Sequence, residues 1–264
     1  MSRVTQVQNF ARAGYLARAV VYILVGYFAL NTASSKGASG VLEQILSAPG
    51  GQFLLILTGI GLLGYAIFRL YGAALDIQGN GTGAKGLAKR IGHAASGLGH
   101  LYLAYFAIST ATGTKSGGGG GGGAGEAASG VASMPGGEFL LIVIGLGFLG
   151  AAVAQGVKAY TGKFMGLLDA DAPAIAKYLG HAGYAARAVV FAVIGYELVT
   201  KTLAGNAGAV GGIGKVLSSL RDTQWLYMAV AFGLLLFGLF SLVMARYRTI
   251  RNEDVIERLK AEAR

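Results

Sequence analysis

The chain has no cysteine among its 264 residues, and few of its side chains are charged. Without cysteine it can form no disulfide, use no thiol chemistry and bind no metal through thiolates. Charged residues make up 13% of the sequence, against about 25% in a soluble globular domain. Hydrophobic residues reach 54%, and 45 residues are glycine. This composition indicates a polytopic membrane protein, in which glycine lets helices approach one another closely.

Acidic residues are the scarcer charged class: 12 Asp and Glu stand against 22 Lys and Arg, for a formal net charge of +10. A basic chain could bind nucleic acid, but these basic residues are dispersed at the ends of apolar runs. That placement is the positive-inside pattern of membrane proteins. We therefore expect membrane lipids as partners, acidic phospholipids among them, and no nucleic acid.

Six apolar stretches are long enough to cross a membrane, at about 20 residues each. The segments 34–50, 113–136 and 201–223 hold only five basic residues, and the remaining 17 of the 22 lie in the opposite loops, the termini and the adjoining helix ends. Because Lys and Arg concentrate on the cytoplasmic side, we expect a multi-pass protein of the cytoplasmic (inner) membrane with both termini in the cytoplasm. The predicted spans are 13–33, 51–72, 93–112, 137–158, 181–203 and 224–246.

Internal repeats organise these spans. PGGQFLLILTGIGLLG (49–64) matches PGGEFLLIVIGLGFLG (135–150) at a step of 86 residues, and the same step leads on to Gln224. AGYLARAVVYILVGY (13–27) returns as AGYAARAVVFAVIGY (182–196), so we read the first apolar run as a retained helix rather than a cleaved signal. IGHAA (91–95) matches the LGHAG segment that begins at residue 179.

The repeats predict an all-α fold of six transmembrane helices in three tandem hairpins, related by a pseudo-threefold axis along the membrane normal. The first hairpin occupies residues 1–72 and the second 73–158, with a glycine-rich outer loop at 113–136. The third occupies 159–248, and a charged cytosolic tail, 249–264, follows.

The two AGY segments and the terminal FGLFSLVMARYR (237–248) resemble the DUF1206 family of bacterial integral membrane proteins. The resemblance extends over nearly the whole chain. It implies six transmembrane helices in three tandem repeats in the cytoplasmic membrane, and it implies neither an activity nor catalytic residues. In the middle copy, Gly99 aligns with Arg18 and Arg187, which departs from the pattern.

Arg18 and Arg187 stand five residues into their predicted helices, which is about 7–8 Å of helix. A long arginine side chain can reach the headgroups from that depth, so an interfacial anchor is one interpretation. The alternative is a site for an anion or an acidic-lipid headgroup on the cytoplasmic side. That hypothesis includes the aligned residues at the starts of the first, third and fifth predicted helices, because basic groups at helix N-termini favour anions. Its members are Arg12, Arg18, His93, His181 and Arg187.

Glu197 and Lys201 form a favourable spacing for a charge pair near the outer end of their helix. A local salt bridge and a proton or cation relay are the two interpretations. Arg69, Gln155 and Ser241 are equivalent at steps of 86 residues. We expect Arg69 to extend toward the cytoplasmic side and Gln155 to form a hydrogen bond between helices.

Catalysis and cofactors find no support in the sequence. His93 and His100 share a helix face without a nearby carboxylate, so we expect no metal site and no cofactor. Since no nucleophile–base set is present, we expect no enzyme. The predicted function is a structural, lipid-binding or complex-forming membrane component, alone, as a homo-oligomer or with a membrane partner. A small-solute or ion transporter along the pseudo-threefold axis is the alternative.

Overall fold

The structure, a computed structural model, is all-α. It describes residues 3–32, 46, 49–76, 79–114, 128–211, 216–217 and 219–249. The glycine tract of the predicted outer loop and the predicted cytosolic tail after Thr249 lie outside these residues. The long helices are α1 (Arg3–Thr32), α3 (Gly51–Ala74), α4 (Ala84–Ala111), α6 (Gly137–Thr161), α7 (Ile175–Leu203) and α9 (Gln224–Tyr247). Short 3-10 turns lie at Lys163–Leu167 and Ala207–Ala209.

The two Pro-Gly-Gly segments start α3 and α6 in the same way. Gly50 and Gly136 precede these helices with φ values of 73° and 74°. Only glycine adopts this left-handed conformation without strain, so each sequence copy fixes one helix start.

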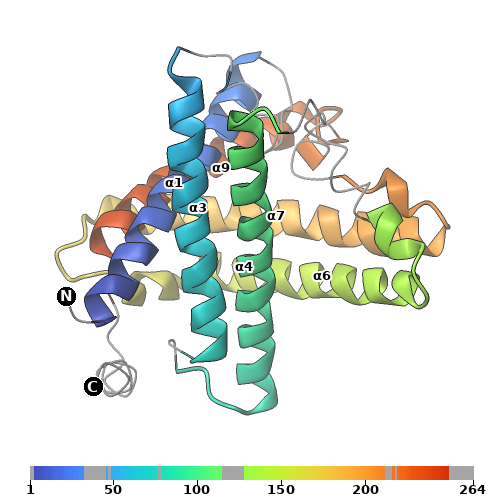
Figure 1. Cartoon of the computed structure of the whole chain (residues 1–264), viewed down its shortest axis with the longest axis horizontal. Coiled ribbons are helices and arrows are strands. Elements are labelled where there is room, and N and C mark those ends of the chain that lie inside the picture. Colours follow the sequence, from blue (N-terminus) through green and yellow to red (C-terminus); the bar gives the residue numbers. More distant parts are fainter. Residues whose placement is uncertain are drawn as a thin grey trace.

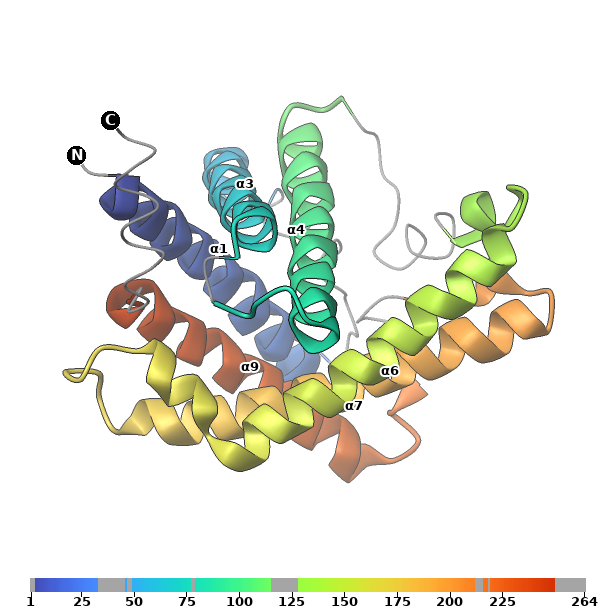
Figure 2. The same cartoon turned by 90° about the horizontal axis from the view of Figure 1, so that it is seen from below.

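The helices pack as three antiparallel pairs. The most extensive contacts join α3 to α4, α6 to α7, and α9 to α1. The second long helix of each repeat therefore packs on the first long helix of the next repeat, and α9 of the last repeat packs on α1. Smaller contacts join α1 to α3 and α7 to α9, which are the first and third predicted hairpins. The packed helices form the row α4, α3, α1, α9, α7, α6, so the two helices of the second predicted hairpin, α4 and α6, lie at its opposite ends. The α3–α4 pair crosses the α6–α7 pair at a steep angle (Figures 1 and 2).

Glycine contacts repeat between the first and third hairpins. A Cβ atom on Gly61 of α3 would lie 2.7 Å from the Ala17 Cβ atom of α1. Its equivalent on Gly233 of α9 would lie 2.5 Å from the Ala186 Cβ atom of α7. The third equivalent, Gly147 of α6, has open space around it. The same interface is therefore built twice, and its third copy is open.

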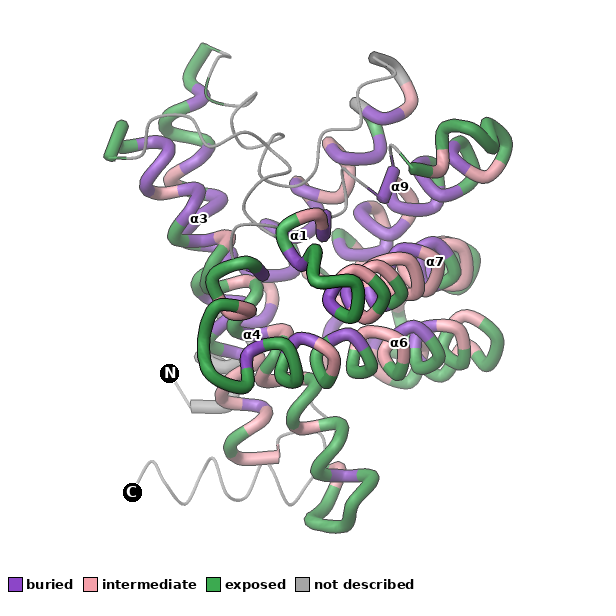
Figure 3. Tube along the Cα trace, turned by 90° about the vertical axis from the view of Figure 1, so that its right-hand side faces the viewer, coloured by how far each residue is buried: buried purple, intermediate pink, exposed green. Residues whose placement is uncertain are grey.

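Four of the described helices, α3, α6, α7 and α9, are long and apolar enough to cross a membrane, judged by length and composition. Large apolar side chains also cover much of the outer surface. Phe53, Phe139 and Trp225, which are equivalent at steps of 86 residues, are 70%, 73% and 73% exposed. Figure 3 shows exposed residues along the outer faces of α4 and α6, and buried residues where α1 and α9 meet. These are the features of a multi-pass membrane protein.

Candidate functional site

Arg18 lies in the interior of the protein, on the face that α1 turns toward α3 and α9. Its side chain is 6% exposed. The Nε atom donates a hydrogen bond to Ser241 Oγ at 3.1 Å, and Nη1 donates to the Tyr65 hydroxyl at 2.9 Å. The guanidinium carbon also lies 4.6 Å from the centroid of the Tyr15 ring. The prediction that Arg18 anchors the helix at the headgroups is therefore wrong, because neighbouring helices bury it.

Arg69 approaches the same tyrosine from α3. Its Nε donates to Ser96 Oγ of α4 at 3.3 Å, and its guanidinium carbon lies 5.6 Å from the Tyr65 centroid. The His100 ring packs edge-on against Tyr65 at 4.5 Å between centroids. Two arginines from different helices of the first hairpin thus contact one buried tyrosine.

Arg187 reaches the cluster from α7. Its guanidinium carbon lies 4.5 Å from the centroid of Phe237, and Arg18 lies 4.8 Å from the same ring. Arg187 Nε is buried and has no hydrogen-bond partner among the described residues. The same holds for Oε1 of Gln155 on α6, a side chain that is 9% exposed. Arginine is always charged, so an unbonded buried Nε is a costly arrangement.

The α1–α9 pair sets a register that can be compared with the other two pairs. A Cβ atom on Gly26 would lie 2.8 Å from the Ala231 carbonyl oxygen. Arg18 stands eight residues before Gly26, and Ser241 stands ten residues after Ala231. The hydrogen bond between Arg18 and Ser241 belongs to this register.

The α7–α6 pair has the same register. A Cβ atom on Gly195 would lie 2.8 Å from the Gly145 carbonyl oxygen. Arg187 stands eight residues before Gly195, and Gln155 stands ten residues after Gly145. Arg187 and Gln155 are therefore the equivalents of Arg18 and Ser241, although the equivalent hydrogen bond is missing.

The α4–α3 pair completes the set. A Cβ atom on Gly59 would lie 3.3 Å from the Ala104 carbonyl oxygen, with Ser96 eight residues before Ala104 and Arg69 ten residues after Gly59. Ser96 thus holds the arginine position of the middle repeat, and the alignment through Gly99 is wrong by three residues. In each helix pair, this register matches one arginine with one uncharged polar residue. We call these three pairs the arginine triad: Arg18–Ser241, Arg69–Ser96 and Arg187–Gln155.

The triad carries positive charge without a carboxylate partner. The charges of Arg18, Arg69 and Arg187 all act on Tyr65, as does that of Lys158. Among the described residues the one salt bridge is between Lys201 and Glu197, so no cation of the triad is neutralised by an acidic side chain there.

His181 and Arg90 lie at helix ends, away from the triad's hydrogen bonds. His181 Nδ1 donates to the Ala159 carbonyl in the last turns of α6, and its ring packs on Phe164. Arg90 donates to the Ala73 carbonyl of α3 at 2.7 Å. Ala73 and Ala159 are 86 residues apart, so Arg90, rather than His93, is the equivalent of His181.

The other two members of the predicted anion site are less connected. Arg12 Nε is buried and has no hydrogen-bond partner among the described residues. His93 is partly buried in the first half of α4. Their part in ligand binding stays a prediction.

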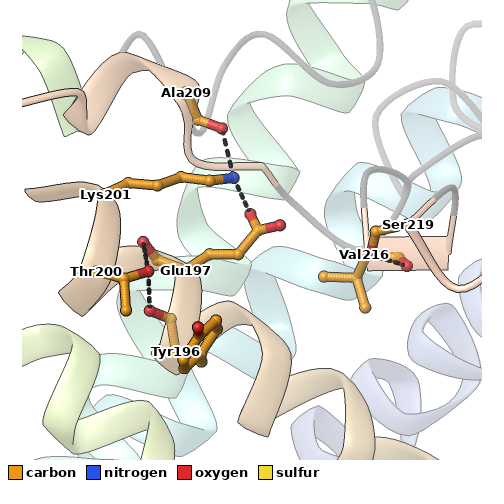
Figure 4. A network of polar contacts seen from close by, with 7 residues as sticks. All are labelled: Tyr196, Glu197, Thr200, Lys201, Ala209, Val216 and Ser219. Atoms are coloured by element: carbon orange, nitrogen blue, oxygen red, sulfur yellow. Dashed lines mark hydrogen bonds and ion pairs between the residues drawn. The ribbon is translucent and has the colours of Figure 1, made fainter. Parts of the chain in front are cut away.

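Glu197 and Lys201 form a local pair at the end of α7. Lys201 Nζ lies 2.8 Å from Glu197 Oε2 and donates to the Ala209 carbonyl at 3.0 Å (Figure 4). The lysine thereby links α7 to the 3-10 turn that follows it, which is a structural role. Within the described ranges, no group of three or more metal-ligating side chains is present.

Three antiparallel helix pairs with repeated contacts, apolar outer faces and four helices of spanning length define a multi-pass membrane protein built from tandem repeats. The chain belongs to the DUF1206 family, a Domain of Unknown Function, whose profile matches residues 13–76, 91–162 and 182–248. The first two matches begin 78 residues apart, as do Arg18 and Ser96. The family match therefore agrees with the register of the triad.

A relative extends the comparison over nearly the whole chain. The Uncharacterized protein YxxB of Bacillus subtilis (strain 168) is 31% identical over 265 residues, which cover 94% of this chain and 95% of that protein. No solved structure matches the chain.

Tyr65 is the part of the site that sequence reasoning missed. It has no polar equivalent in the other repeats, where Ala151 and Phe237 take its place at steps of 86 residues. The equivalence of Arg69, Gln155 and Ser241 was the available signal, because it placed one polar residue at the same depth of every even helix.

Proposed function

We propose that this chain is a non-enzymatic protein of the cytoplasmic membrane that binds an anion at the arginine triad. The proposed ligand is the headgroup of an acidic phospholipid or a soluble anion of the same chemistry. Both termini are proposed to lie in the cytoplasm. We also propose that α1 and α4 span the membrane, in addition to α3, α6, α7 and α9.

The observation that carries the proposal is the concentration of positive charge on one buried and two partly buried arginines. Arg18, Arg69 and Arg187 contact one aromatic cluster, and no acidic side chain of the described residues forms a salt bridge with them. Uncompensated charge in an apolar interior is expensive, and a membrane protein retains it where a ligand or a partner group neutralises it. An anion supplies that neutralising charge.

Close packing favours a binding site over an open pathway. A Cβ atom on Gly183 would lie 2.7 Å from the Phe237 Cα atom, and one on Gly14 would clash with Tyr65. The backbones of α1 and α7 therefore lie directly against Tyr65 and Phe237, the aromatic residues that the arginines contact. Transport is the alternative, favoured by the presence of one such arginine in each of the three packed helix pairs.

Lipid analysis tests the binding proposal. The purified chain should retain acidic phospholipid, and Arg187→Gln should reduce the bound amount severalfold, as measured by mass spectrometry of the extracted lipids. Lys177→Gln is the matched control, because it removes one charge from an exposed site on the same helix. Equal lipid retention in both variants and the wild type would contradict the proposal. Anion flux into proteoliposomes, abolished by Arg187→Gln, would support transport instead.

The topology can be tested cleanly because the chain has no cysteine of its own. Single cysteines at Ser133 and Lys163 flank α6 and are exposed. A membrane-impermeant thiol reagent added to intact cells should label Ser133→Cys and spare Lys163→Cys. The reverse labelling would overturn the proposed orientation.

A further inference from the structure

The third pair of the arginine triad differs from the other two in one respect. Arg18 Nε donates to Ser241 Oγ at 3.1 Å, and Arg69 Nε donates to Ser96 Oγ at 3.3 Å. In the equivalent pair, Arg187 Nε and Gln155 Oε1 are both buried, and neither has a hydrogen-bond partner among the described residues. The donor and the acceptor that correspond to the bonded atoms of the other two pairs are thus both left unsatisfied.

Helix packing does not account for the missing bond. The α6–α7 and α9–α1 pairs share the register set by Gly195 and Gly26, each of which would place a Cβ atom 2.8 Å from a carbonyl oxygen of the facing helix. Gln155 also has a longer side chain than Ser241, so it has the greater reach. Buried polar groups almost always find a partner. An unpaired donor and an unpaired acceptor at the positions of the bonded Arg18–Ser241 pair therefore indicate that a further group binds both of them.

The two orphan atoms define the chemistry of that group. Arg187 Nε can only donate, and it carries positive charge, so an anionic acceptor satisfies both its hydrogen-bonding capacity and its charge. Gln155 Oε1 can only accept, so it requires a donor. Chloride and fully deprotonated sulfate satisfy the arginine alone. A phosphate that carries a hydroxyl satisfies both, through its own P–OH group or through a hydroxyl on an attached glycerol.

We propose that Arg187 and Gln155 form a specific site for a hydroxyl-bearing phosphate group, in which the phosphate oxygen accepts from Arg187 Nε and the hydroxyl donates to Gln155 Oε1. This inference rests on the proposed anion-binding function and places the ligand at the third pair. Arg18 already donates to Ser241 and Tyr65, and Arg69 to Ser96. They supply positive charge around the site rather than its specific contacts.

Matched ligands test the hydroxyl requirement in the full chain. Phosphatidylglycerol and phosphatidylmethanol carry the same phosphodiester charge, and only the first has headgroup hydroxyls. Inorganic phosphate and sulfate at neutral pH form the soluble counterpart. In detergent solution the wild type should prefer the hydroxyl-bearing member of a pair by about five- to tenfold, the value of one hydrogen bond to a buried group. Preference within the lipid pair identifies a headgroup as the ligand, and preference within the soluble pair identifies free phosphate.

Three variants separate this inference from the proposed function. Gln155→Met keeps the side-chain volume and removes the acceptor, so it should abolish the preference while binding of phosphatidylmethanol persists. Lys177→Gln, at an exposed position of α7 outside the triad, should leave the preference intact. Arg187→Gln should weaken binding of all four probes.

The outcomes are distinguishable. A wild type without preference in either ligand pair, or a preference that survives Gln155→Met, would overturn the inference. The proposed function would survive that result if Arg187→Gln still weakened binding. If Arg187→Gln left all binding unchanged, both would fail. The wild-type comparison needs no substitution, so the inference stays testable even if Gln155→Met does not fold.

Discussion

Arg90 and His181 are equivalent in the repeats, and each donates a hydrogen bond to an alanine carbonyl in the last turns of the preceding helix. Each residue stands in the first turns of its own helix, where a cation would oppose the helix dipole. The carbonyl ends of α3 and α6 provide the compensating negative end. Basic residues at these helix starts therefore join consecutive helices, and they need no anion for this role.

This relationship predicts a stability effect for His181. His181→Ala removes the bond to Ala159 and part of the contact with Phe164. We expect it to lower the free energy of unfolding by about 0.5–1.5 kcal/mol, the net value of a hydrogen bond. Denaturation in detergent followed by circular dichroism measures the change. His93→Ala is the control, since no hydrogen bond of His93 to the described residues is observed, and equal losses in both variants would contradict the helix-end role.

The Tyr65 hydroxyl should contribute measurably to stability. Tyr65→Phe removes an acceptor of Arg18 and leaves a charged donor buried, so we expect a loss of about 1.5–3 kcal/mol. Tyr15→Phe is the matched control, because Tyr15 contacts Arg18 through its ring face. Thermal unfolding of the detergent-solubilised variants gives the comparison. A similar melting temperature for both variants would show that the 2.9 Å bond contributes little.

Glycine substitutions should divide by position. Gly183→Ala forces α7 away from the Phe237 backbone, so we expect loss of the folded protein or a strong fall in its melting temperature. Gly147→Ala should be neutral or mildly stabilising, because its surroundings are open and alanine is the better helix former. Size-exclusion chromatography of the heated protein measures both. A destabilising Gly147→Ala would indicate that a neighbour covers α6 at this point.

The turn between α3 and α4 should respond to pH. Slight burial acts to raise the pKa of the Asp76 carboxyl, but hydrogen bonds from the Asn80 and Gly81 backbone amides outweigh it and hold the pKa below its ordinary value. A depressed carboxyl pKa stabilises the turn above the ordinary value of about 4, and this stabilisation is lost as pH falls through the folded-state pKa.

Hydrogen exchange of the Asn80 and Gly81 amides, corrected for intrinsic rates, measures this effect. In the wild type, the protection of these two amides should decrease as the pH is lowered. In Asp76→Asn it should be lower at neutral pH and insensitive to acid. Protection that stays constant in the wild type would remove the proposed role of the carboxylate.

The sequence predicted the helices and the tandem repeats, but of the triad it named only Arg18 and Arg187 as site residues. Arg18 and Ser241 are 223 residues apart, so no local pattern links them. A depth estimate made along one helix placed Arg18 near the headgroups, because it took no account of the helices that bury it.

The register of the middle repeat failed for a different reason. Gly99 and Ser96 differ by three residues, which is close to one helical turn, so both lie on nearly the same helix face. Local similarity at IGHAA could not separate the two alignments. The packing of Gly59 against Ala104 separates them, since it fixes which residue of α4 faces Arg69.

The open place between α4 and α6 has a consequence for assembly. The helices before it, α1, α3 and α4, and those after it, α6, α7 and α9, are joined mainly by the contact of α1 with α9. That contact includes Gly26 on Ala231, Gly238 on Ile23 and the bond from Arg18 to Ser241. None of it depends on a peptide connection between α4 and α6. We therefore expect that the two halves, if they were synthesised as separate polypeptides, would associate in the bilayer through the contact of α1 with α9.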